Sequence, residues 1–188
     1  MRIISGSFRG KKILEPKDIK TRPLKDLTKE SIFNILNHSK KFKINLENSE
    51  ILDLFSGVGS FGIECLSRGV KSVIFVENYN GVLPVLKKNL QNLKSIENYK
   101  VIEKDINNGK IFETLDKKFD IVFMDPPYKD KNLNLLLENL ENIKILNKNG
   151  IVVIHRHKNE QDMIPKNFKV IEEKRYGLSK IIFLSLLN

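Results

Sequence analysis

Short apolar runs alternate with longer amphipathic stretches from Glu50 onward in this 188-residue chain. The runs hold four to six residues, which is typical of buried parallel strands, and the stretches between them have the spacing of crossover helices. This alternation predicts an α/β fold with a mostly parallel sheet. The predicted strands are 51–55, 72–76, 99–103, 121–124 and 150–155, and the predicted helices are 60–69, 79–93 and 131–141.

Two more apolar segments lie near the end of the chain, at 168–175 and 180–187. They flank the turn sequence Tyr176-Gly177-Leu178-Ser179, so we expect an antiparallel hairpin there. The whole sheet would then have about seven strands, flanked by helices.

The first 43 residues have a different pattern from the rest of the chain. Two short segments, 2–5 and 11–14, enclose a basic turn bounded by glycines, which predicts a β-hairpin. Apolar residues then recur at helical spacing and predict an amphipathic helix over 25–37. We therefore expect a basic N-terminal extension, residues 1–43, made of a hairpin and a helix, followed by a second domain, residues 44–188.

The charge of the chain is concentrated in this extension. The chain has 33 Lys and Arg against 23 Asp and Glu, a formal net charge of +10, and residues 1–43 hold 12 of the basic and 4 of the acidic side chains. A basic segment of this kind predicts a polyanionic partner such as nucleic acid. A solvated Lys-rich surface accounts for the lysines after residue 80, which are interspersed with acids.

Composition excludes several classes of protein. Hydrophobic residues make up 40% and charged residues 30%, a balance that supports a buried core and argues against a disordered or collagen-like chain. No apolar run approaches the roughly 20 residues that cross a bilayer, and the first residues lack the apolar core of a signal peptide, so we expect a cytoplasmic protein without a membrane partner. Cys65 is the only cysteine, which excludes an internal disulfide; we expect it to be a buried structural thiol.

A glycine-rich turn follows directly after the strand at 51–55. Gly57 and Gly59 allow the backbone to approach a ligand, and Gly62 allows the next helix to pack close to the sheet. Glu77 ends the following strand, 20 residues after Gly57, where its carboxylate can accept hydrogen bonds from a ribose. This spacing satisfies the dinucleotide fingerprint, so an enzyme that uses nicotinamide or flavin is one alternative.

Asp53 favours a different cofactor. It lies within the strand, four residues before Gly57, where a pyrophosphate would be a poor neighbour and a cationic amino group a good one. S-adenosylmethionine (SAM) has such a group and no phosphate, so we expect SAM as the cofactor. Asp105, just past the third strand, is placed either to meet the adenine amino group or to cap a helix. The predicted cofactor-binding residues are Asp53, Ser56, Gly57, Gly59, Glu77 and Asp105.

The tetrapeptide Asp125-Pro126-Pro127-Tyr128 follows the strand that ends at Met124, at the edge where open α/β sheets bind ligands. The two prolines fix the backbone and remove two N–H donors, so the remaining acceptors form a rigid pair suited to an exocyclic amine. Tyr128 can stack on a base that has been taken out of its helix. The predicted catalytic residues are Asp125, Pro126, Pro127 and Tyr128, which would hold the amine in line with the methyl group of SAM without a metal ion or a covalent intermediate.

Two histidines lie close together on one strand. His155 and His157 share one face, which could suggest a metal pair, but no third ligand accompanies them and we predict no metal site. His155 faces the ligand edge and is a candidate for lining the pocket, whereas His157 and His38 are expected at the surface.

These motifs resemble those of a known family. The segment 53–69 together with Asp125-Pro126-Pro127-Tyr128 resembles class I SAM-dependent amino-methyltransferases, with a Rossmann-like fold. The segment 1–13, then Thr21-Arg22-Pro23 and residues 26–34, are similar to the RsmD family, which methylates N2 of one guanine in small-subunit (16S) ribosomal RNA. Three positions differ from the family pattern: the helix opening has Leu27 and Lys29 where arginines are usual, and His155 stands where a carboxylate is common.

The resemblance implies what the extension and the pocket bind. The partner would be small-subunit rRNA or the assembling 30S subunit, bound by a monomer, with residues 44–188 as the methyltransferase domain. Adenine N6 in DNA or RNA, a protein glutamine amide as acceptor, and a non-catalytic ribosome assembly factor are the alternatives. Phosphate contacts are expected from Arg2, Arg9, Lys11, Lys12 and Arg22.

Overall fold

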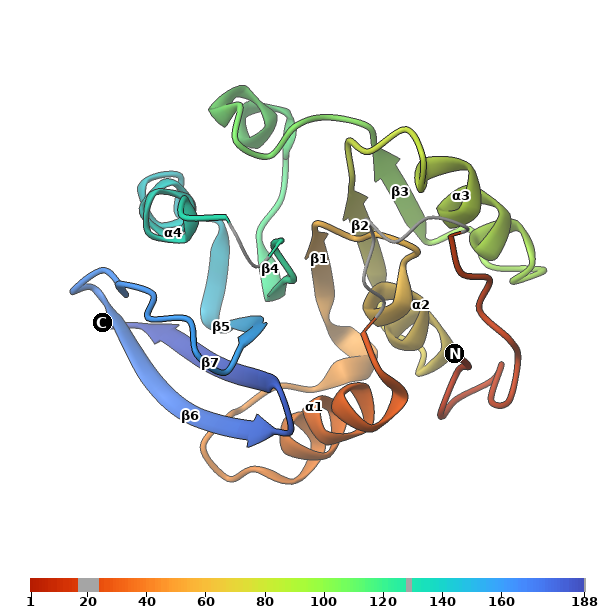
Figure 1. Ribbon diagram of the computed structural model, residues 1–188, viewed down its shortest axis with the longest axis horizontal. Coiled ribbons are helices and arrows are strands. Elements are labelled where there is room, and N and C mark those ends of the chain that lie inside the picture. The colour runs from red at the N-terminus through yellow and green to blue at the C-terminus, as the bar shows by residue number, and fades with distance from the viewer. Residues whose placement is uncertain (17–23, 128–129, 188) are drawn as a thin grey trace.

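The apolar runs form a seven-stranded sheet in the computed structural model, which describes residues 1–16, 24–127 and 130–187. The strand order is β3-β2-β1-β4-β5-β7-β6 (Figure 1). The first five strands are parallel, and β7 lies antiparallel between β5 and β6, so the predicted sheet and its C-terminal hairpin are confirmed. The strands are β1 (Glu50–Leu54), β2 (Ser72–Val76), β3 (Tyr99–Ile102), β4 (Phe119–Met124), β5 (Leu146–His157), β6 (Phe168–Tyr176) and β7 (Ser179–Leu186).

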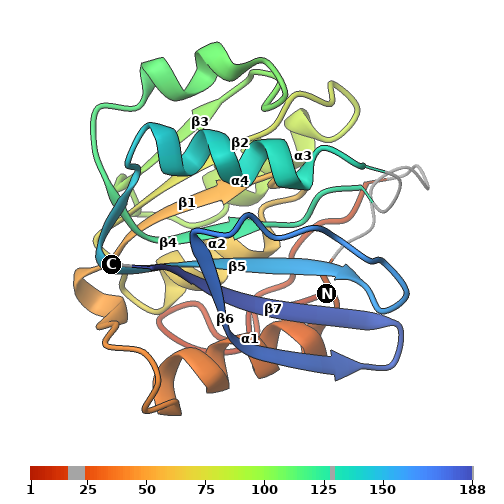
Figure 2. The same cartoon turned by 90° about the vertical axis from the view of Figure 1, so that its left-hand side faces the viewer.

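Helices cover both faces of the sheet. Successive residues of each strand point to opposite sides, so the apolar residues of one strand pack against helices on both faces. Ile51 of β1 packs in a cluster with α1, α2 and α3, whereas Leu52 and Leu54 pack with η2 and α4. Figure 2 shows α1 and α4 on opposite sides of the sheet. The helices are α1 (Asp26–His38), α2 (Ser60–Ser67), α3 (Leu83–Gln91) and α4 (Leu133–Asn142), with the short 3-10 helices η1 (Leu46–Asn48) and η2 (Gly109–Thr114).

Two boundaries differ from the sequence-based prediction for identifiable reasons. Helix α3 starts at Leu83 and not at residue 79, because residues 79–82 form a turn in which the Val82 N–H donates to the carbonyl of Tyr79 at 3.0 Å. Strand β5 starts at Leu146 and not at residue 150, because Leu146 already pairs with Phe119 across an irregularity in the β4–β5 register.

The N-terminal hairpin is shorter than predicted. Residues 2–5 and 11–14 form no extended strands, but an isolated antiparallel bridge joins Arg2 and Lys12, and the Ile3 N–H donates to the carbonyl of Lys11 at 2.9 Å. Contacts with the body of the protein also hold the segment. Ile3 and Ile13 are each 1% exposed and belong to the same hydrophobic cluster as α1, α2 and α3. The extension therefore packs as part of the main core.

Cys65 of α2 is confirmed as a buried thiol. Burial raises the pKa of this thiol well above its ordinary value, and the nearby charges of Asp53 and Glu64 raise it further. A thiol in these surroundings stays protonated and packs as a small apolar group.

Candidate active site

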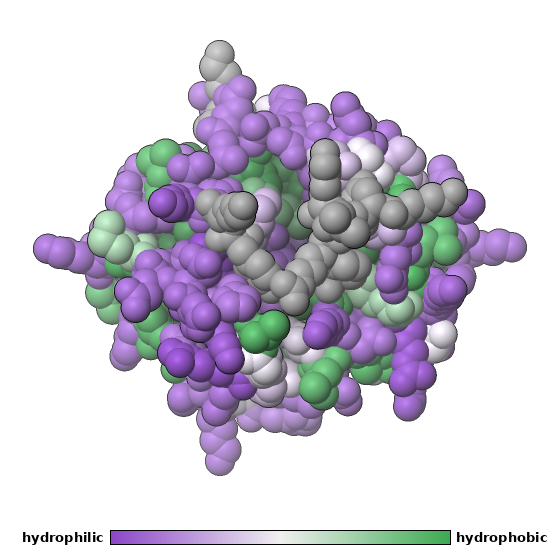
Figure 3. Space-filling view, viewed as in Figure 1, coloured by the Kyte–Doolittle hydropathy of each residue, from purple (hydrophilic) through white to green (hydrophobic). Residues whose placement is uncertain are grey.

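A cavity of about 530 Å³ lies at the carboxyl ends of the parallel strands, within the size range of small-molecule sites. The surface seen from the same side as Figure 1 is mostly hydrophilic and is hollowed near its centre (Figure 3). The cavity brings together most of the predicted site residues, although they come from the ends of five different strands. Those that line it are Asp53, Ser56, Gly57, Glu77, Asp105, Asp125, Pro126, Pro127 and His155.

The glycine turn is held in place by hydrogen bonds to the second strand. The Ser56 hydroxyl donates to the carbonyl of Asp53 at 2.6 Å and accepts the N–H of Val76 at 3.0 Å. Gly57 and Gly59 both have positive φ, 55° and 84°, which favours glycine at these positions. A Cβ on Gly59 would lie 2.6 Å from the side chain of Leu86, so Gly59, which is not among the lining residues, acts through the shape of the turn.

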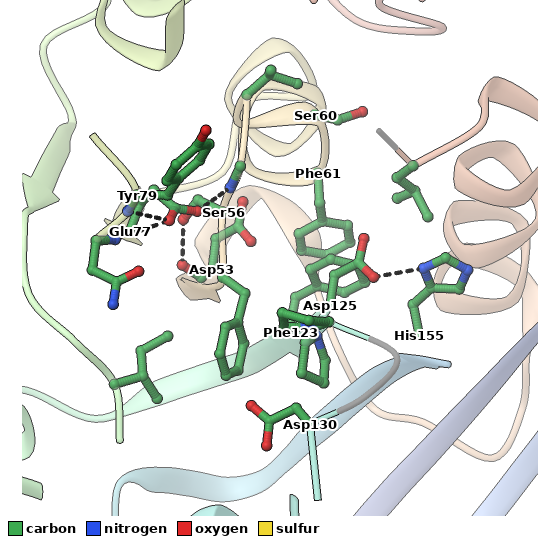
Figure 4. Close-up of a pocket in the computed structure, with 18 of the residues that line it drawn as sticks. Asp53, Ser56, Ser60, Phe61, Glu77, Tyr79, Phe123, Asp125, Asp130 and His155 are labelled. Carbon is green, nitrogen blue, oxygen red and sulfur yellow. Dashed lines mark hydrogen bonds and ion pairs between the residues drawn. The ribbon is translucent and has the colours of Figure 1, made fainter. Parts of the chain in front are cut away.

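Glu77 faces the cavity with its carboxylate already oriented (Figure 4). Its Oε2 accepts the N–H of Gly57 at 2.7 Å, and its Oε1 accepts the N–H groups of Asn78 and Tyr79, both at 2.9 Å. A carboxylate offers about four acceptor positions, so this one can still accept hydrogen bonds from a ligand.

Asp53 is the most buried carboxylate of the cavity, with 1% exposure. Burial raises its pKa well above the ordinary value; the Gly62 N–H, 3.0 Å from Oδ2, lowers it, and the negative charges of Asp125 and Glu77 raise it. A Cβ on Gly62 would lie 2.3 Å from the Phe75 ring, which confirms that Gly62 is needed for close packing of α2 on the sheet. A cationic ligand group would relieve the unfavourable charge at Asp53.

Asp125 lies on the opposite side of the cavity at the end of β4, and its side chain is 19% exposed. Its Oδ1 is 2.8 Å from Nδ1 of His155, and Nε2 of His155 is 2.9 Å from the Ser179 hydroxyl (Figure 4). The Arg156 guanidinium donates a hydrogen bond to the carbonyl of Pro127 at 3.1 Å and another to the carbonyl of Asp130 at 3.0 Å. These contacts fix the two residues in place after Asp125. Tyr128 lies outside the described residues.

Known proteins are similar to this chain in sequence and in fold. The family model described as Conserved hypothetical protein 95 matches residues 1–185. A protein from Haemophilus influenzae named ribosomal RNA small subunit methyltransferase D is 35% identical, over 95% of this chain and 90% of its own length. This chain belongs to the RsmD family of rRNA methyltransferases.

Other members agree in sequence and in structure. The Escherichia coli ribosomal RNA small subunit methyltransferase D is 32% identical to this RsmD-family chain, over 94% of this chain and 85% of its own length. The solved structure of the Escherichia coli protein YhhF has a TM-score of 0.79 and 26% identity, covering 98% of this chain and 96% of that one. The fold is therefore that of a methyltransferase with a Rossmann-like sheet.

Several lining residues of this RsmD-family cavity escaped the sequence-based prediction. Three of them are polar residues close after predicted cofactor-binding acids: Asn78 and Tyr79 after Glu77, and Asn107 after Asp105. Their position just after a strand end could have marked them as lining residues. Phe61 and Phe123 stack with ring centroids 4.0 Å apart and form part of the wall between the glycine turn and Asp125. No local pattern marks this pair, since one ring comes from α2 and the other from β4.

The predicted RNA-binding residues lie on the extension, outside the cavity lining. Arg2, Arg9, Lys11 and Lys12 are all exposed, and Lys11 also donates to the carbonyl of Asn92, at the end of α3. The extension runs beside α2 and α3 in Figure 1. Arg22 lies outside the described residues.

Two features are absent from the described part of the chain. Within 1–16, 24–127 and 130–187, no helix is both long and apolar enough to cross a membrane. The same residues include no group of three or more His, Cys, Asp or Glu side chains that could hold a metal ion.

Proposed function

We propose that this protein transfers the methyl group of SAM to the exocyclic N2 amine of a guanine in small-subunit (16S) rRNA. The observation that carries the proposal is that one cavity is lined by Asp53 and Glu77 on one side and by Asp125-Pro126-Pro127 on the other. The carboxylates of Asp53 and Glu77 suit a cationic ribonucleoside, and the acceptors of Asp125-Pro126-Pro127 suit the amine that receives the methyl group. Membership of a family of rRNA methyltransferases supports both assignments and favours SAM over a dinucleotide.

The residues present fit SAM. Glu77 would accept hydrogen bonds from the ribose hydroxyls, because its carboxylate is already fixed by three backbone N–H groups. Asp53 would face the amino acid end, whose ammonium offsets the burial of this carboxylate. Asp105 lines the cavity and would meet the adenine amino group. When bound, SAM supplies an electrophilic methyl group on a sulfonium.

The acceptor amine is positioned by groups at the end of β4. The Asp125 carboxylate and the carbonyl beside it accept the two N–H groups, which directs the nitrogen lone pair toward the methyl carbon. The amine nitrogen would gain the methyl group of SAM as the bond from that methyl to sulfur breaks with its electron pair left on sulfur, and the nitrogen would then release a proton to water. Asp125 stabilises the positive charge that develops on the nitrogen during this step. Tyr128 would stack on the guanine.

The extension supplies the RNA contact in this proposal. Arg2, Arg9, Lys11, Lys12 and Arg22 contact phosphates, and residues 44–188 carry out methyl transfer. Because these phosphate contacts carry no base information, the choice of guanine rests with the pocket.

The test is transfer of labelled methyl from SAM to unmodified small ribosomal subunits, naked rRNA and duplex DNA, followed by nucleoside analysis. We expect N2-methylguanosine from the ribosomal substrates alone. Asp125→Asn should lower kcat about 100-fold or more, because the amide no longer stabilises a developing cation. Asp116→Asn, at an exposed position outside the cavity, is the matched control.

The other outcomes separate the alternatives. N6-methyladenine in the product would keep the mechanism and overturn the substrate. Transfer by Asp125→Asn at the wild-type rate would overturn the role of Asp125. RNA binding without transfer to any substrate would favour an assembly factor.

A further inference from the structure

We propose that His155 is a positioning residue that orients the Asp125 carboxylate for the acceptor amine. The proposal deepens the proposed function and rests on it. A carboxylate at the end of a strand can rotate about its side-chain bonds, and a rotated carboxylate would present the wrong edge to the amine. His155 and Ser179 together remove this freedom.

The contact joins three strands. Asp125 follows β4, His155 is in β5 and Ser179 begins β7, so residues 30 and 24 positions from His155 in the sequence meet at one imidazole ring. Nδ1 is 2.8 Å from Asp125 Oδ1 and Nε2 is 2.9 Å from Ser179 Oγ. The side chain of His155 is 8% exposed. A buried ring with a partner at each nitrogen has one preferred orientation.

Strand pairing explains why Ser179 reaches this ring. In the antiparallel β5–β7 pair, Ser179 is directly opposite His157, and His155 is opposite Ile181. Ser179 is therefore the diagonal neighbour of His155 on the same face of the sheet. Arg156, between the two histidines, points to the other face and holds the carbonyls of Pro127 and Asp130. Two consecutive residues of β5 thus support the carboxylate and the loop that follows it.

The hydrogen-bond pattern also assigns the tautomer. An ionised carboxylate only accepts hydrogen bonds, so Nδ1 of His155 carries the hydrogen and donates to Asp125. When the ring is neutral, Nε2 then accepts the hydroxyl of Ser179. The Nδ1–H donor fixes one carboxylate oxygen, Oδ1, in place. The other oxygen, Oδ2, can accept the amine.

The ionisable groups around this pair are mostly acids. Asp53, Glu77 and Asp130 line the same cavity, and the buried pair Lys29 and Glu64 lies behind Ser60, another lining residue. The negative potential of these acids favours a cationic cofactor and a cationic transition state.

The kinetic test compares His155→Leu with His155→Asn. The asparagine amide N–H can replace Nδ1–H as a donor to Asp125, whereas leucine cannot. We expect His155→Leu to lower kcat about 10- to 100-fold with an unchanged KM for SAM, since the misplaced group is the carboxylate that faces the amine. His155→Asn should recover activity to within about threefold of wild type, and Ser179→Ala should have an intermediate effect. His157→Asn, on the same strand face and outside the cavity lining, is the control.

Two kinetic results would overturn the proposal. One is a His155→Leu variant that keeps the wild-type kcat. The other is a His155→Asn variant that is as slow as His155→Leu while both unfold at similar temperatures. Asparagine can donate a hydrogen bond and leucine, of similar size, cannot, so equal rates would mean that His155 acts only through packing.

A second measurement does not depend on catalysis. The chain has three histidines, so the imidazole nitrogen signals of His155 can be assigned by NMR from the single variants. We expect the Nδ1–H form in the wild-type protein and its loss in Asp125→Ala. An unchanged ring signal in Asp125→Ala would overturn the contact itself. Absence of methyl transfer by the wild-type protein would instead overturn the proposed function. NMR would then still detect the contact between His155 and Asp125, but that contact would have no role in catalysis.

Discussion

At the scale of single residues, the cavity contains a carboxylate whose surroundings disfavour its charge. Asp53 is 1% exposed, and its pKa is raised first by burial and then by the charges of Asp125 and Glu77. Such a group destabilises the ligand-free protein when it ionises and binds a cation well once ionised. Under the proposed function, burial of Asp53 favours ligand binding at the expense of folding stability.

Asp53→Asn should therefore have opposite effects on stability and on binding. Above the ordinary pKa of an aspartate, about 4, the folded state is penalised for ionising Asp53, so the variant should unfold at a higher temperature near pH 7. SAM should bind the wild-type protein more tightly as the pH rises through the raised pKa of Asp53, because the carboxylate gives up its proton there. The variant should lose this dependence in calorimetric titrations.

The control for this prediction is a ligand without the amino acid end. Methylthioadenosine lacks the ammonium group, so its affinity should change little between wild type and Asp53→Asn. Equal loss of affinity for both ligands would mean that Asp53 does not face the ammonium.

At the scale of elements, α2 is the platform on which the N-terminal extension docks. The Glu64 carboxylate of α2 accepts hydrogen bonds from the backbone N–H groups of Ile4 at 2.8 Å and Ser5 at 2.9 Å. It also accepts a hydrogen bond from Nε of Arg68 at 2.9 Å. Lys29 of α1 lies 3.6 Å from the same carboxylate; burial lowers the pKa of its amine, while Glu64 and Asp26 act to raise it. The extension and the helix that follows the glycine turn are thus linked through buried polar groups.

Gly6 and Gly10 allow this docking to be tested with a matched pair. Both have a φ of 84°, but a Cβ on Gly6 would lie 1.7 Å from the Ser67 carbonyl oxygen, whereas none of the surrounding atoms lies within 4 Å of a Cβ on Gly10. Gly10→Ala should cost about 1–2 kcal/mol from backbone strain alone. Gly6→Ala should cost a further ~1–3 kcal/mol, because the extension has to move off α2.

Urea unfolding measures both costs, and hydrogen exchange locates them. In Gly6→Ala the amides of Ile4 and Ser5 should exchange faster, whereas Gly10→Ala should leave them protected. Similar losses of stability in the two variants would mean that close packing against Ser67 contributes little.

At the scale of the whole molecule, four exposed basic residues of the extension lie outside the cavity lining. The extension holds most of the net charge of +10, and its exposed residues Arg2, Arg9, Lys11 and Lys12 are outside the cavity lining. Binding to a polyanion releases counterions in proportion to the phosphates that the protein neutralises. Affinity for RNA should therefore depend on the extension and on salt, and base choice should not.

Arg9→Gln/Lys12→Gln should reduce the slope of log affinity against log salt by about 1–2, because each phosphate that is no longer neutralised lowers the slope by about 0.7–0.9. Lys118→Gln/Lys148→Gln removes the same charge from exposed positions near the amino ends of β4 and β5, at the edge of the sheet opposite the cavity. This control should leave the slope nearly unchanged in filter-binding measurements. Equal changes in both pairs would mean that net charge alone governs binding.

Much of the fold and of the cavity lining could be predicted from local sequence. Buried parallel strands need continuous apolar runs, and acids directly after such strands lie at one edge of the sheet, so position alone indicated that Glu77, Asp105 and Asp125 would lie together, and all three line the cavity. The C-terminal hairpin was found in the same way, because its turn lies between two adjacent runs. These features depend on residues that are near one another in the chain.

Only the tertiary structure decided how separate segments meet. The N-terminal hairpin is shorter than its sequence predicts, because Glu64 and Ser67 of α2 bind backbone groups that a longer pair of strands would otherwise use. The contact of His155 with Asp125 and Ser179 depends on the strand order and on the β5–β7 register. Periodicity assigns a residue to a face of its own strand, but the partner across that face is set by packing between segments far apart in sequence.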